Sequence, residues 1–459
     1  SALRVAVLPL INISPDAEDA YFAAGMTEEL VSRLSRLSGL RVIGRTSVMR
    51  YADTDRPIAE IGQALDVSAV LDGSVRKAGD DVRISVQLLD AASGVALWSE
   101  DYDAEAADAL AVQRAIAEQV AAALLVQMKS GEQHRLAKYG TDVQEAYELY
   151  LKGRYFVDTW DEASVIKGRN ALQQAVDLDP AFAEAWAVLA DAYKVLDYLA
   201  VLSPDEAGPR IRAAAERALT LDPELAAAHA ALALVLIDYY SDWETAGHHH
   251  RRAVELDPGS ASSLTWYAEY LRDLGRFDEA LEMIEKAQAA DPLSPWPLMV
   301  EGIILDFARR PEEALVQYER LLEMHPNYRI AHFYAGLANV QLARYEVVLA
   351  EMDRIDPERT FPDAMGLRGL ALAAMGREAE ARAVLDELEA LSEKRYVAPF
   401  LKALVALYLG EMDRALDLFE ETIGERSWFI RIYNVAPPLD PVRSHPRFQA
   451  LLERIGMET

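Results

Sequence analysis

Three adjacent histidines, His248 to His250, are the residues whose type most directly suggests chemistry, because imidazole is a common metal ligand. The surrounding pattern predicts a helix. Consecutive helical residues point about 100° apart, so three adjacent rings cannot converge on one ion. His250 also falls at a packing position of the repeat described below. We therefore expect no metal site here.

Carboxylates and hydroxyls form no clearer catalytic group. Glu28 and Glu29 are adjacent, but they are predicted to lie early in a helix, where negative charge complements the helix dipole. Ser32, Ser35 and Ser38 have no paired histidine. Gly-X-Ser-X-Gly, HExxH and P-loop patterns do not occur, and the chain has no Cys. We expect a chain that is not an enzyme and that holds no cofactor.

A 34-residue spacing organises the second half of the chain. Pro258, Pro292 and Pro326 repeat at this interval, and each ends a segment with a helical pattern. A small residue precedes each proline by 12 positions, and a second small or apolar residue precedes it by 5; these residues are Ala246, Ala280 and Ala314, then Ala253, Ala287 and Leu321. This period and pattern are typical of the tetratricopeptide helix-turn-helix repeat.

The repeats can be traced in both directions from these prolines. We expect about eight of them in residues 143–424, stabilised by stacking on their neighbours. Trp186, Leu189 and Tyr193 match the apolar pattern of a first helix and are expected to be buried. Gly275, Gly376 and Gly410 follow first helices and are predicted to be C-cap glycines.

Residues 1–131 have a different pattern, typical of a small α/β domain. The run 3–10 predicts a buried strand, and Phe22, Met26, Leu30 and Leu34 form the apolar stripe of a helix over residues 16–38. Further strands are expected at 40–45, 82–88 and 95–102, with helices at 58–65 and from 108 onward. The predicted fold class is an α/β small mixed-sheet domain followed by an all-α tetratricopeptide repeat superhelix. Residues 132–142 are expected to be a linker, and residues 425–459 a C-terminal capping segment.

Composition limits the partners. The chain has 459 residues, of which 51% are hydrophobic, and a formal net charge of −29. Such a surface repels nucleic acid and anionic membranes over most of its area, so we expect no nucleic-acid binding by this chain. No run of residues is long and apolar enough for a membrane helix.

The N-terminal segments resemble a known family. The segments are Val7–Leu10, Asn12–Ser14, Tyr21–Leu30, Val42–Ser47, Val70–Arg76 and Leu97–Tyr102, and they look like the TolB-like amino-terminal domain. The C-terminal segments 438–441 and 445–456 look like the tail that follows the repeats in such proteins. In similar bacterial regulators this pair follows a winged-helix, nucleotide cyclase or Ser/Thr kinase effector, often after one membrane helix. The resemblance implies an extracytoplasmic sensory or partner-binding region and no catalytic residues.

The repeat register predicts which first-helix side chains face the concave groove. The partner-binding residues expected there are Trp296, Met299, Ile303, Phe333, Tyr147, Tyr150, Arg154, Glu269 and Arg272. An apolar and aromatic wall of this kind suits an extended peptide or an amphipathic helix. The same side chains could instead be buried between helices, against the N-terminal domain or against a second copy of the chain.

Two functions remain open at this point. The first is a non-catalytic sensory and protein-interaction region of a bacterial signalling regulator, which binds a peptide or protein. The second is a passive periplasmic scaffold for a protein assembly. A membrane tether through a preceding segment and a homodimer are compatible with both. The expected location is extracytoplasmic, or cytoplasmic if no membrane helix precedes the chain.

Overall fold

The computed structural model describes residues 3–16, 19–35, 37, 39–52, 54, 56–105, 108–124, 140–159, 161–199, 201–356, 358 and 361–457. Most of the predicted linker, residues 132–139, lies outside this described part. The chain forms two compact units. The first contains Ser1–Val235, His248–Leu264 and Lys286–Ser294, and the second contains Leu236–Gly247, Thr265–Glu285 and Pro295–Thr459.

The N-terminal domain is built on a six-stranded mixed sheet with the order β3-β1-β4-β5-β6, and β2 also pairs with β4. Its elements are β1 (Leu3–Val7), β2 (Ile11–Asn12), α1 (Ala20–Ser35), β3 (Leu40–Val42), α2 (Arg45–Met49), α3 (Ile58–Leu65), β4 (Ala69–Ala78), β5 (Asp81–Asp90), β6 (Ala96–Glu105) and α4 (Ala109–Ala123). Strands β1, β3 and β4 run parallel, while β5 and β6 extend the sheet as antiparallel neighbours. The fold class predicted for this part is confirmed, and β2 and α2 were not foreseen.

Alternation along the strands sets the two faces of this sheet. Val82, Ile84, Val86 and Leu88 of β5 are at most 2% exposed and alternate with polar residues, as the sequence pattern predicts. Gly79, with a φ of 66°, forms the tight turn from β4 into β5. A residue without a Cβ adopts this left-handed conformation at no steric cost.

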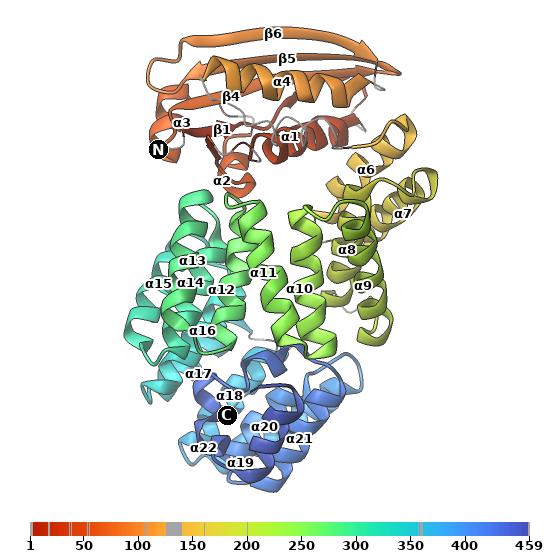
Figure 1. The fold of residues 1–459 in the computed structure, drawn as a ribbon. Coiled ribbons are helices and arrows are strands. Elements are labelled where there is room, and N and C mark those ends of the chain that lie inside the picture. Colours follow the sequence, from red (N-terminus) through yellow and green to blue (C-terminus); the bar gives the residue numbers. More distant parts are fainter. Residues whose placement is uncertain are drawn as a thin grey trace. The chain divides into compact units, whose positions relative to one another are not determined.

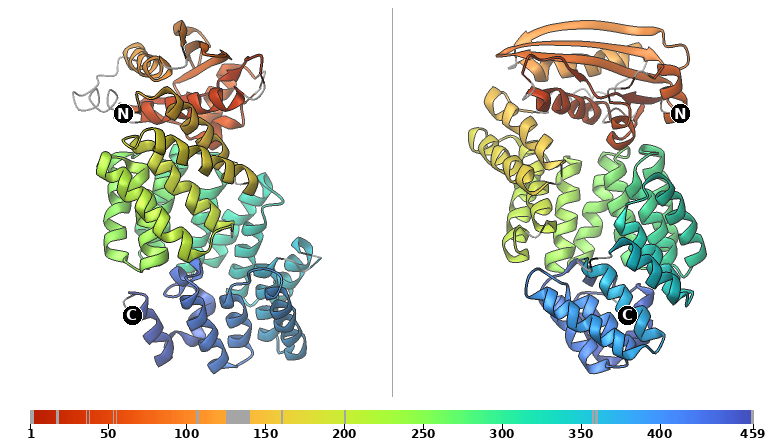
Figure 2. Two further views of the ribbon diagram at one scale, coloured as in Figure 1. Left: turned by 90° about the vertical axis from the view of Figure 1, so that its right-hand side faces the viewer. Right: turned by 180° about the vertical axis from the view of Figure 1, so that it is seen from behind.

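Helices cover both faces of the sheet to different extents. Helices α1 and α4 lie side by side on one face (Figures 1 and 2). The predicted stripe of α1 is confirmed, because Phe22, Met26, Leu30 and Leu34 are fully buried. Helix α3 packs Ile61 and Leu65 into a second core cluster on the other face, over the start of β4.

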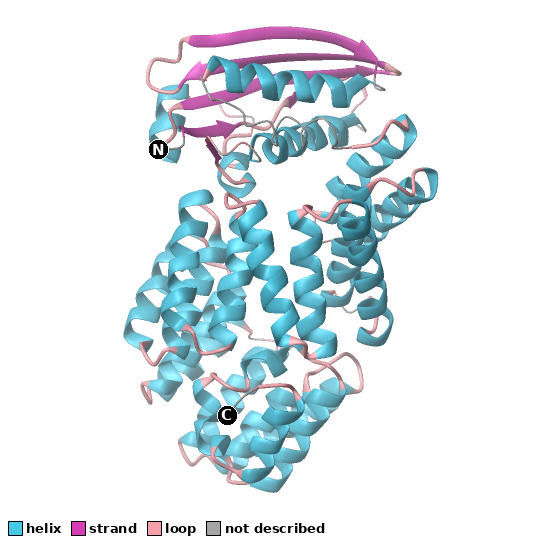
Figure 3. Ribbon diagram, in the orientation of Figure 1, coloured by secondary structure: helices cyan, strands magenta, loops and turns pink. Residues whose placement is uncertain are grey.

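Helices follow one another from Gln144 to Gly424, and Figure 3 shows this part of the chain as helical. In chain order, the helices of the described residues form eight consecutive pairs. The pairs are α6 (Gln144–Val157) with α7 (Glu162–Leu178), α8 (Ala183–Tyr198) with α9 (Pro204–Leu221), α10 (Ala226–Tyr240) with α11 (Trp243–Leu256), α12 (Ala261–Asp273) with α13 (Phe277–Ala290), α14 (Pro295–Phe307) with α15 (Pro311–Met324), α16 (Arg329–Gln341) with α17 (Tyr345–Ile355), α18 (Pro362–Ala374) with α19 (Glu378–Ser392), and α20 (Pro399–Tyr408) with α21 (Met412–Gly424).

The 34-residue register is confirmed by burial. Ala246, Ala280 and Ala314 are each the fourth residue of a second helix, and each is 0% exposed. A methyl group at this position lets the two helices of a pair approach closely, and a larger side chain would separate them. The spacing read from the sequence therefore corresponds to one repeated packing contact.

First-helix predictions are confirmed in part. Leu189 and Tyr193 are buried, whereas Trp186 is only half-buried. The Trp186 indole packs on a small alanine-rich cluster and donates from Nε1 to the Pro180 carbonyl at 3.2 Å. Its ring thus lies at the margin of the core and not in its centre.

Short helices complete the chain after the last pair. They are η3 (Trp428–Ile432), η4 (Pro437–Leu439), α22 (Asp440–Arg443) and α23 (Pro446–Arg454). Phe429 stacks on Phe400 of α20 at 4.4 Å between ring centroids, and the Tyr433 hydroxyl donates to the Phe419 carbonyl at 3.1 Å. This aromatic cluster covers the apolar surface that the last repeat would otherwise expose.

None of the helices in the described residues has the length and apolar character that crossing a membrane requires.

Candidate partner-binding surfaces

The groove residues predicted in the first repeat are covered by the N-terminal domain. Tyr147 and Tyr150 of α6 are 2% and 1% exposed, because α6 packs against α1. The Tyr150 hydroxyl donates to Glu29 at 2.7 Å, and Arg154 donates to the same carboxylate oxygen at 2.7 Å. The Tyr147 hydroxyl accepts from Gln113 of α4 at 2.6 Å. These side chains therefore hold two parts of one chain together.

An ionic network surrounds this contact. Arg154 also reaches Glu28 at 3.3 Å, and Arg45 pairs with Glu28 and, at 3.5 Å, with Asp158. Burial raises the pKa of Glu28 above its usual range, while the charges of Arg154 and Arg45 oppose that rise. The expectation that Glu28 and Glu29 lie early in a helix is wrong, because both lie in the middle of α1. They act as partners of the repeats and not as dipole caps.

A second polar cluster surrounds the predicted residues Glu269 and Arg272 on α12. Arg272 is 4% exposed and forms two hydrogen bonds to Asp273, at 2.9 Å from Nε and 2.6 Å from Nη2. Its Nη2 also lies 3.6 Å from Glu269. Burial raises the pKa of Glu269, and the positive charges of Arg272 and Arg431 oppose this.

Arg431 completes this cluster from the C-terminal segment. It is 4% exposed and donates from Nε to Asp273 at 3.1 Å; its Nη1 lies 3.7 Å from Asp238 of α10. Its guanidinium also lies 5.9 Å from the centre of the Trp266 ring. No sequence pattern indicated Arg431, because it is 158 residues from Asp273 and outside the periodic repeats. Part of the predicted groove is thus occupied by the chain's own arginine.

Trp296 is the predicted aromatic residue that stays half-buried at this surface. Its ring meets Trp266 edge-on with 4.6 Å between centroids, and its Nε1 donates to Glu269 at 3.2 Å. Trp266 and Trp296 come from consecutive first helices, α12 and α14. We refer to these two residues as the tryptophan pair.

Three other predicted groove residues lie in packed surroundings. Met299, Ile303 and Phe333 are 8%, 2% and 5% exposed. Their side chains contribute to the core between helices and do not form the exposed apolar wall that the register predicted. The repeat register identifies helix faces, but it cannot tell a groove position from one that a neighbouring helix covers.

The histidines are divided between different surroundings. His249 lies 2.7 Å from His229 between the Nδ1 atoms, and the other His229 ring nitrogen lies 3.0 Å from the Pro223 carbonyl. His250 is 1% exposed. The described residues contain no group of three or more His, Cys, Asp or Glu side chains arranged to hold a metal ion.

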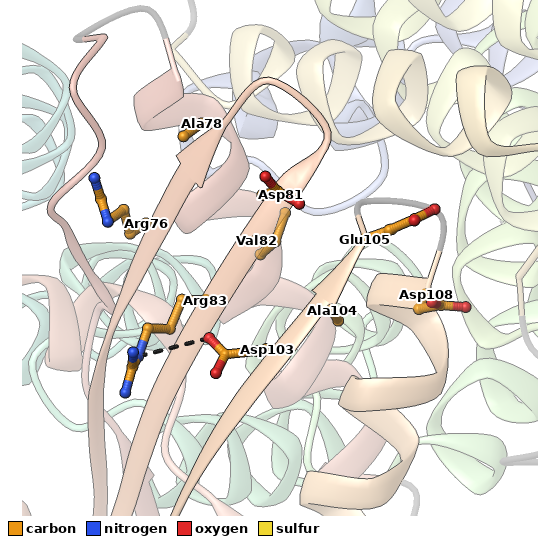
Figure 4. A pocket seen from close by; sticks show the side chains of 9 residues that line it. All are labelled: Arg76, Ala78, Asp81, Val82, Arg83, Asp103, Ala104, Glu105 and Asp108. Carbon is orange, nitrogen blue, oxygen red and sulfur yellow. Dashed lines mark ion pairs between the residues drawn. The ribbon is translucent and has the colours of Figure 1, made fainter.

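A hollow of about 640 Å³ lies in the N-terminal domain (Figure 4). It is lined by Arg76, Ala78, Asp81, Val82, Arg83, Asp103, Ala104, Glu105 and Asp108. Arg83 points toward Asp103, and the two side chains form an ion pair at 3.7 Å. Carboxylates outnumber cations on its walls. The hollow adjoins the outer strand β6.

These features define a class of protein: a small α/β domain joined to an array of tetratricopeptide repeats. Residues 241–295 and 300–357 match the tetratricopeptide repeat family model. Residues 1–119 match the second domain of HilA/YgeH-like transcriptional regulators. Neither match extends over half of the chain. The N-terminal match names a different family from the TolB-like one, so the TolB-like resemblance stays a prediction.

A curated relative matches a larger part of the chain than either family model does. It is "Putative adenylate cyclase 3" of Rhizobium meliloti (strain 1021), which is 37% identical over 185 residues. The match covers 40% of this chain and 32% of that protein. The chain thus matches about a third of the relative's length.

Solved structures of repeat proteins match parts of this chain. A tetratricopeptide repeat protein from Parabacteroides merdae ATCC 43184 has 15% identity and a TM-score of 0.44, covering 58% of this chain and all of that one. Pseudomonas aeruginosa pilF has 20% identity and a TM-score of 0.38, covering 51% of this chain and 98% of that one.

Proposed function

We propose that this chain is the non-catalytic, protein-binding region of a bacterial signalling regulator. Tetratricopeptide repeats are interaction modules, and the described residues offer no metal-binding group. The relative named as an adenylate cyclase supports a signalling role. This chain matches only about a third of that protein, which is compatible with an effector that lies elsewhere in the regulator. In this proposal the effector is carried by another part of the regulator.

The tryptophan pair supports the choice of binding site. Aromatic side chains that remain partly accessible beside buried charges are frequent anchors in protein interfaces. Trp296 is half-buried and lies next to Glu269, so a partner segment meets both an aromatic ring and a carboxylate there. The first repeat is covered by the N-terminal domain, which leaves the middle repeats as the proposed site.

The test is a comparison of partner capture by wild type and Trp296→Ala. We expect the variant to bind the captured partner about 30-fold more weakly, since an aromatic anchor contributes roughly 2 kcal/mol or more. The purified full chain serves as bait in an extract of its source organism, and the affinity for the recovered partner is then measured by calorimetry.

Tyr396→Ala is the matched control, because it removes an aromatic ring that is 55% exposed and lies outside the first helices. It should leave the affinity unchanged. Equal affinity of wild type and Trp296→Ala for the same partner would exclude the tryptophan pair as the principal site.

Two further aspects belong to the same proposal. We place the chain outside the cytoplasm, tethered to a membrane by a preceding segment, as in the TolB-like regulators that it resembles. The alternative is a passive periplasmic scaffold. The residues before Leu3 in the full gene discriminate between them: an effector and a membrane helix favour the sensor, and a lone signal peptide favours the scaffold.

A further inference from the structure

Strand β6 forms an open edge of the N-terminal sheet. It pairs with β5 from Ala96 to Glu105, and in the described part of the chain no strand pairs with its other side. Figure 1 shows it as the outermost strand of this domain. A strand in this position has a row of backbone N–H and C=O groups that the sheet does not satisfy.

The strand is long, and its protection as an edge is limited to a bulge near its start and to negative side chains. It has ten residues, and seven of them are exposed. Natural edge strands are commonly short, bent, or interrupted by lysine or proline, and β6 contains neither residue. Val95, which directly precedes the strand, is 62% exposed, and Leu97 within the strand is 47% exposed. The edge thus combines free backbone groups with an apolar end.

The other end of the strand is acidic. It contains four carboxylates within six residues: Glu100, Asp101, Asp103 and Glu105. The one cation that pairs with them in the described residues is Arg83 of β5, which lies 3.1 Å from Asp101 and 3.7 Å from Asp103. The hollow in Figure 4 continues this acidic surface to Asp81 and Asp108.

This charge pattern selects the occupant. If a second copy of the chain paired its own β6 here in parallel, carboxylates would lie opposite carboxylates, which is destabilising. In a full-length antiparallel pair, Asp103 and Glu105 would lie opposite Trp98 and Ala96 and would gain no cation. A basic strand would place cations opposite them. Side chains of a strand alternate between faces, so Asp101, Asp103 and Glu105 lie on the same face, two residues apart.

We propose that β6 is a docking edge for an extended segment of a partner protein that carries lysine or arginine at alternate positions. The segment adds a seventh strand to the sheet. Backbone hydrogen bonds supply the pairing, and the alternating cations set the register against Asp101, Asp103 and Glu105. An apolar residue at the end of the segment contacts Leu97. This site is separate from the tryptophan pair, so it does not depend on the function proposed for the repeats.

The test uses a fluorescent ten-residue peptide with lysine at alternate positions in a threonine and valine background, added to the full chain. A peptide of the same composition with its lysines in one block is the control. We expect the alternating peptide to bind at least tenfold more tightly by anisotropy, and to slow amide exchange of residues 96–105. Equal binding of the two peptides, or binding without protection of β6, overturns the proposal.

Two triple variants provide the second arm. Asp101→Asn, Asp103→Asn and Glu105→Gln together should weaken binding of the alternating peptide at least tenfold. Asp278→Asn, Glu282→Gln and Glu285→Gln remove the same charge from exposed positions of α13 and should leave it unchanged. Equal effects of both variants indicate non-specific attraction and overturn the proposal, as does a β6-dependent dimer in sedimentation. If a variant folds poorly, the protection of residues 96–105 from amide exchange in the wild-type chain still tests whether the peptide binds at β6.

Discussion

Asp306 shows how a single buried carboxyl affects this protein. It lies on α14 with 0% exposure, and its Oδ1 accepts from Gln341 of α16. Its Oδ2 has no hydrogen-bond partner in the described residues. Burial raises the pKa of Asp306 to about 7, despite the opposing effects of the Gln341 hydrogen bond and the Arg309 charge.

The raised pKa makes the free energy of unfolding depend on pH. The folded state holds the Asp306 proton up to about pH 7, whereas the unfolded chain releases it near the ordinary value of 3.8. Stability from this group is therefore greatest below about pH 4 and falls as pH rises to about 7. The full difference is on the order of 4 kcal/mol, at about 1.4 kcal/mol for each pKa unit.

Asp306→Asn removes the charge while keeping the shape of the side chain. We expect the variant to be more stable than wild type by a few kcal/mol above pH 7 and by much less near pH 4. Urea unfolding of both proteins at pH 4.5 and pH 8 measures this, and the other carboxyls cancel in the comparison. A stability difference that is the same at both pH values would contradict the assigned pKa.

At the scale of the elements, the turns inside several repeats share one backbone conformation. Gly275, Gly376 and Gly410 have φ values of 73°, 75° and 79°, which confirms their prediction as C-cap glycines. Arg309 and Ala343 occupy the same place in their repeats with φ values of 64° and 54°. Residues with a Cβ are strained in this region, so the conformational energy of the same turn is higher in the repeats that have Arg309 or Ala343 than in those that have glycine.

Ala343→Gly should therefore stabilise the protein by about 0.5–1 kcal/mol, because relief of strain outweighs the added freedom of the unfolded chain. The Ala343 side chain is exposed, so no packing is lost. Gly376→Ala is the reverse experiment: a Cβ there would meet no atom within 4 Å, and the cost comes from the backbone alone. Denaturation midpoints should shift in opposite directions, and a decrease for Ala343→Gly would refute the argument.

The elements that could be predicted from sequence are those with a local pattern. Ala246 and Ala280 were placed correctly because helix packing repeats every 34 residues and leaves a visible spacing. The non-glycine turns were missed because Arg309 and Ala343 give no turn signal of their own. Local propensity thus sets the helices, but it does not show where the backbone is strained.

At the scale of the whole molecule, the unpredicted features are contacts between distant segments. Tyr150 and Glu29 are 121 residues apart, and Arg431 and Asp273 are 158 residues apart. No periodic pattern connects such pairs. The site prediction included Tyr150 and Arg272, but it could not identify what covers them, because the covering residues belong to the chain itself.

Asp291 is a further contact of this kind, within the first unit. An aspartate precedes the proline at the end of several repeats, and Asp257 accepts locally from Gly259 N at 3.3 Å. Asp291 occupies the same position 34 residues later, but its carboxylate accepts from the backbone of Thr46 at 3.2 Å and of Ser47 at 2.9 Å, and from the Ser47 hydroxyl. A residue that closes a turn in one repeat thus holds α2 of the N-terminal domain in another.

Asp291→Ala should loosen this contact, because the buried Ser47 donors would lose their acceptor at a cost of roughly 1–3 kcal/mol. We expect amide exchange to accelerate about tenfold or more in residues 45–52 and 290–294, while the helices of the other repeats keep their protection. Asp257→Ala, the matched change one repeat earlier, should affect only its own turn. Gly44→Ala provides an independent check, since its Cβ would lie 2.6 Å from the Asp291 Cβ and should produce the same local acceleration. If Asp291→Ala and Asp257→Ala gave the same exchange pattern, Asp291 would be an ordinary turn residue. The segment around α2 would then be held to the repeat by its other contacts, which include the hydrogen bonds from Gly44 N to the Ala290 carbonyl and from Leu293 N to the Ser47 hydroxyl.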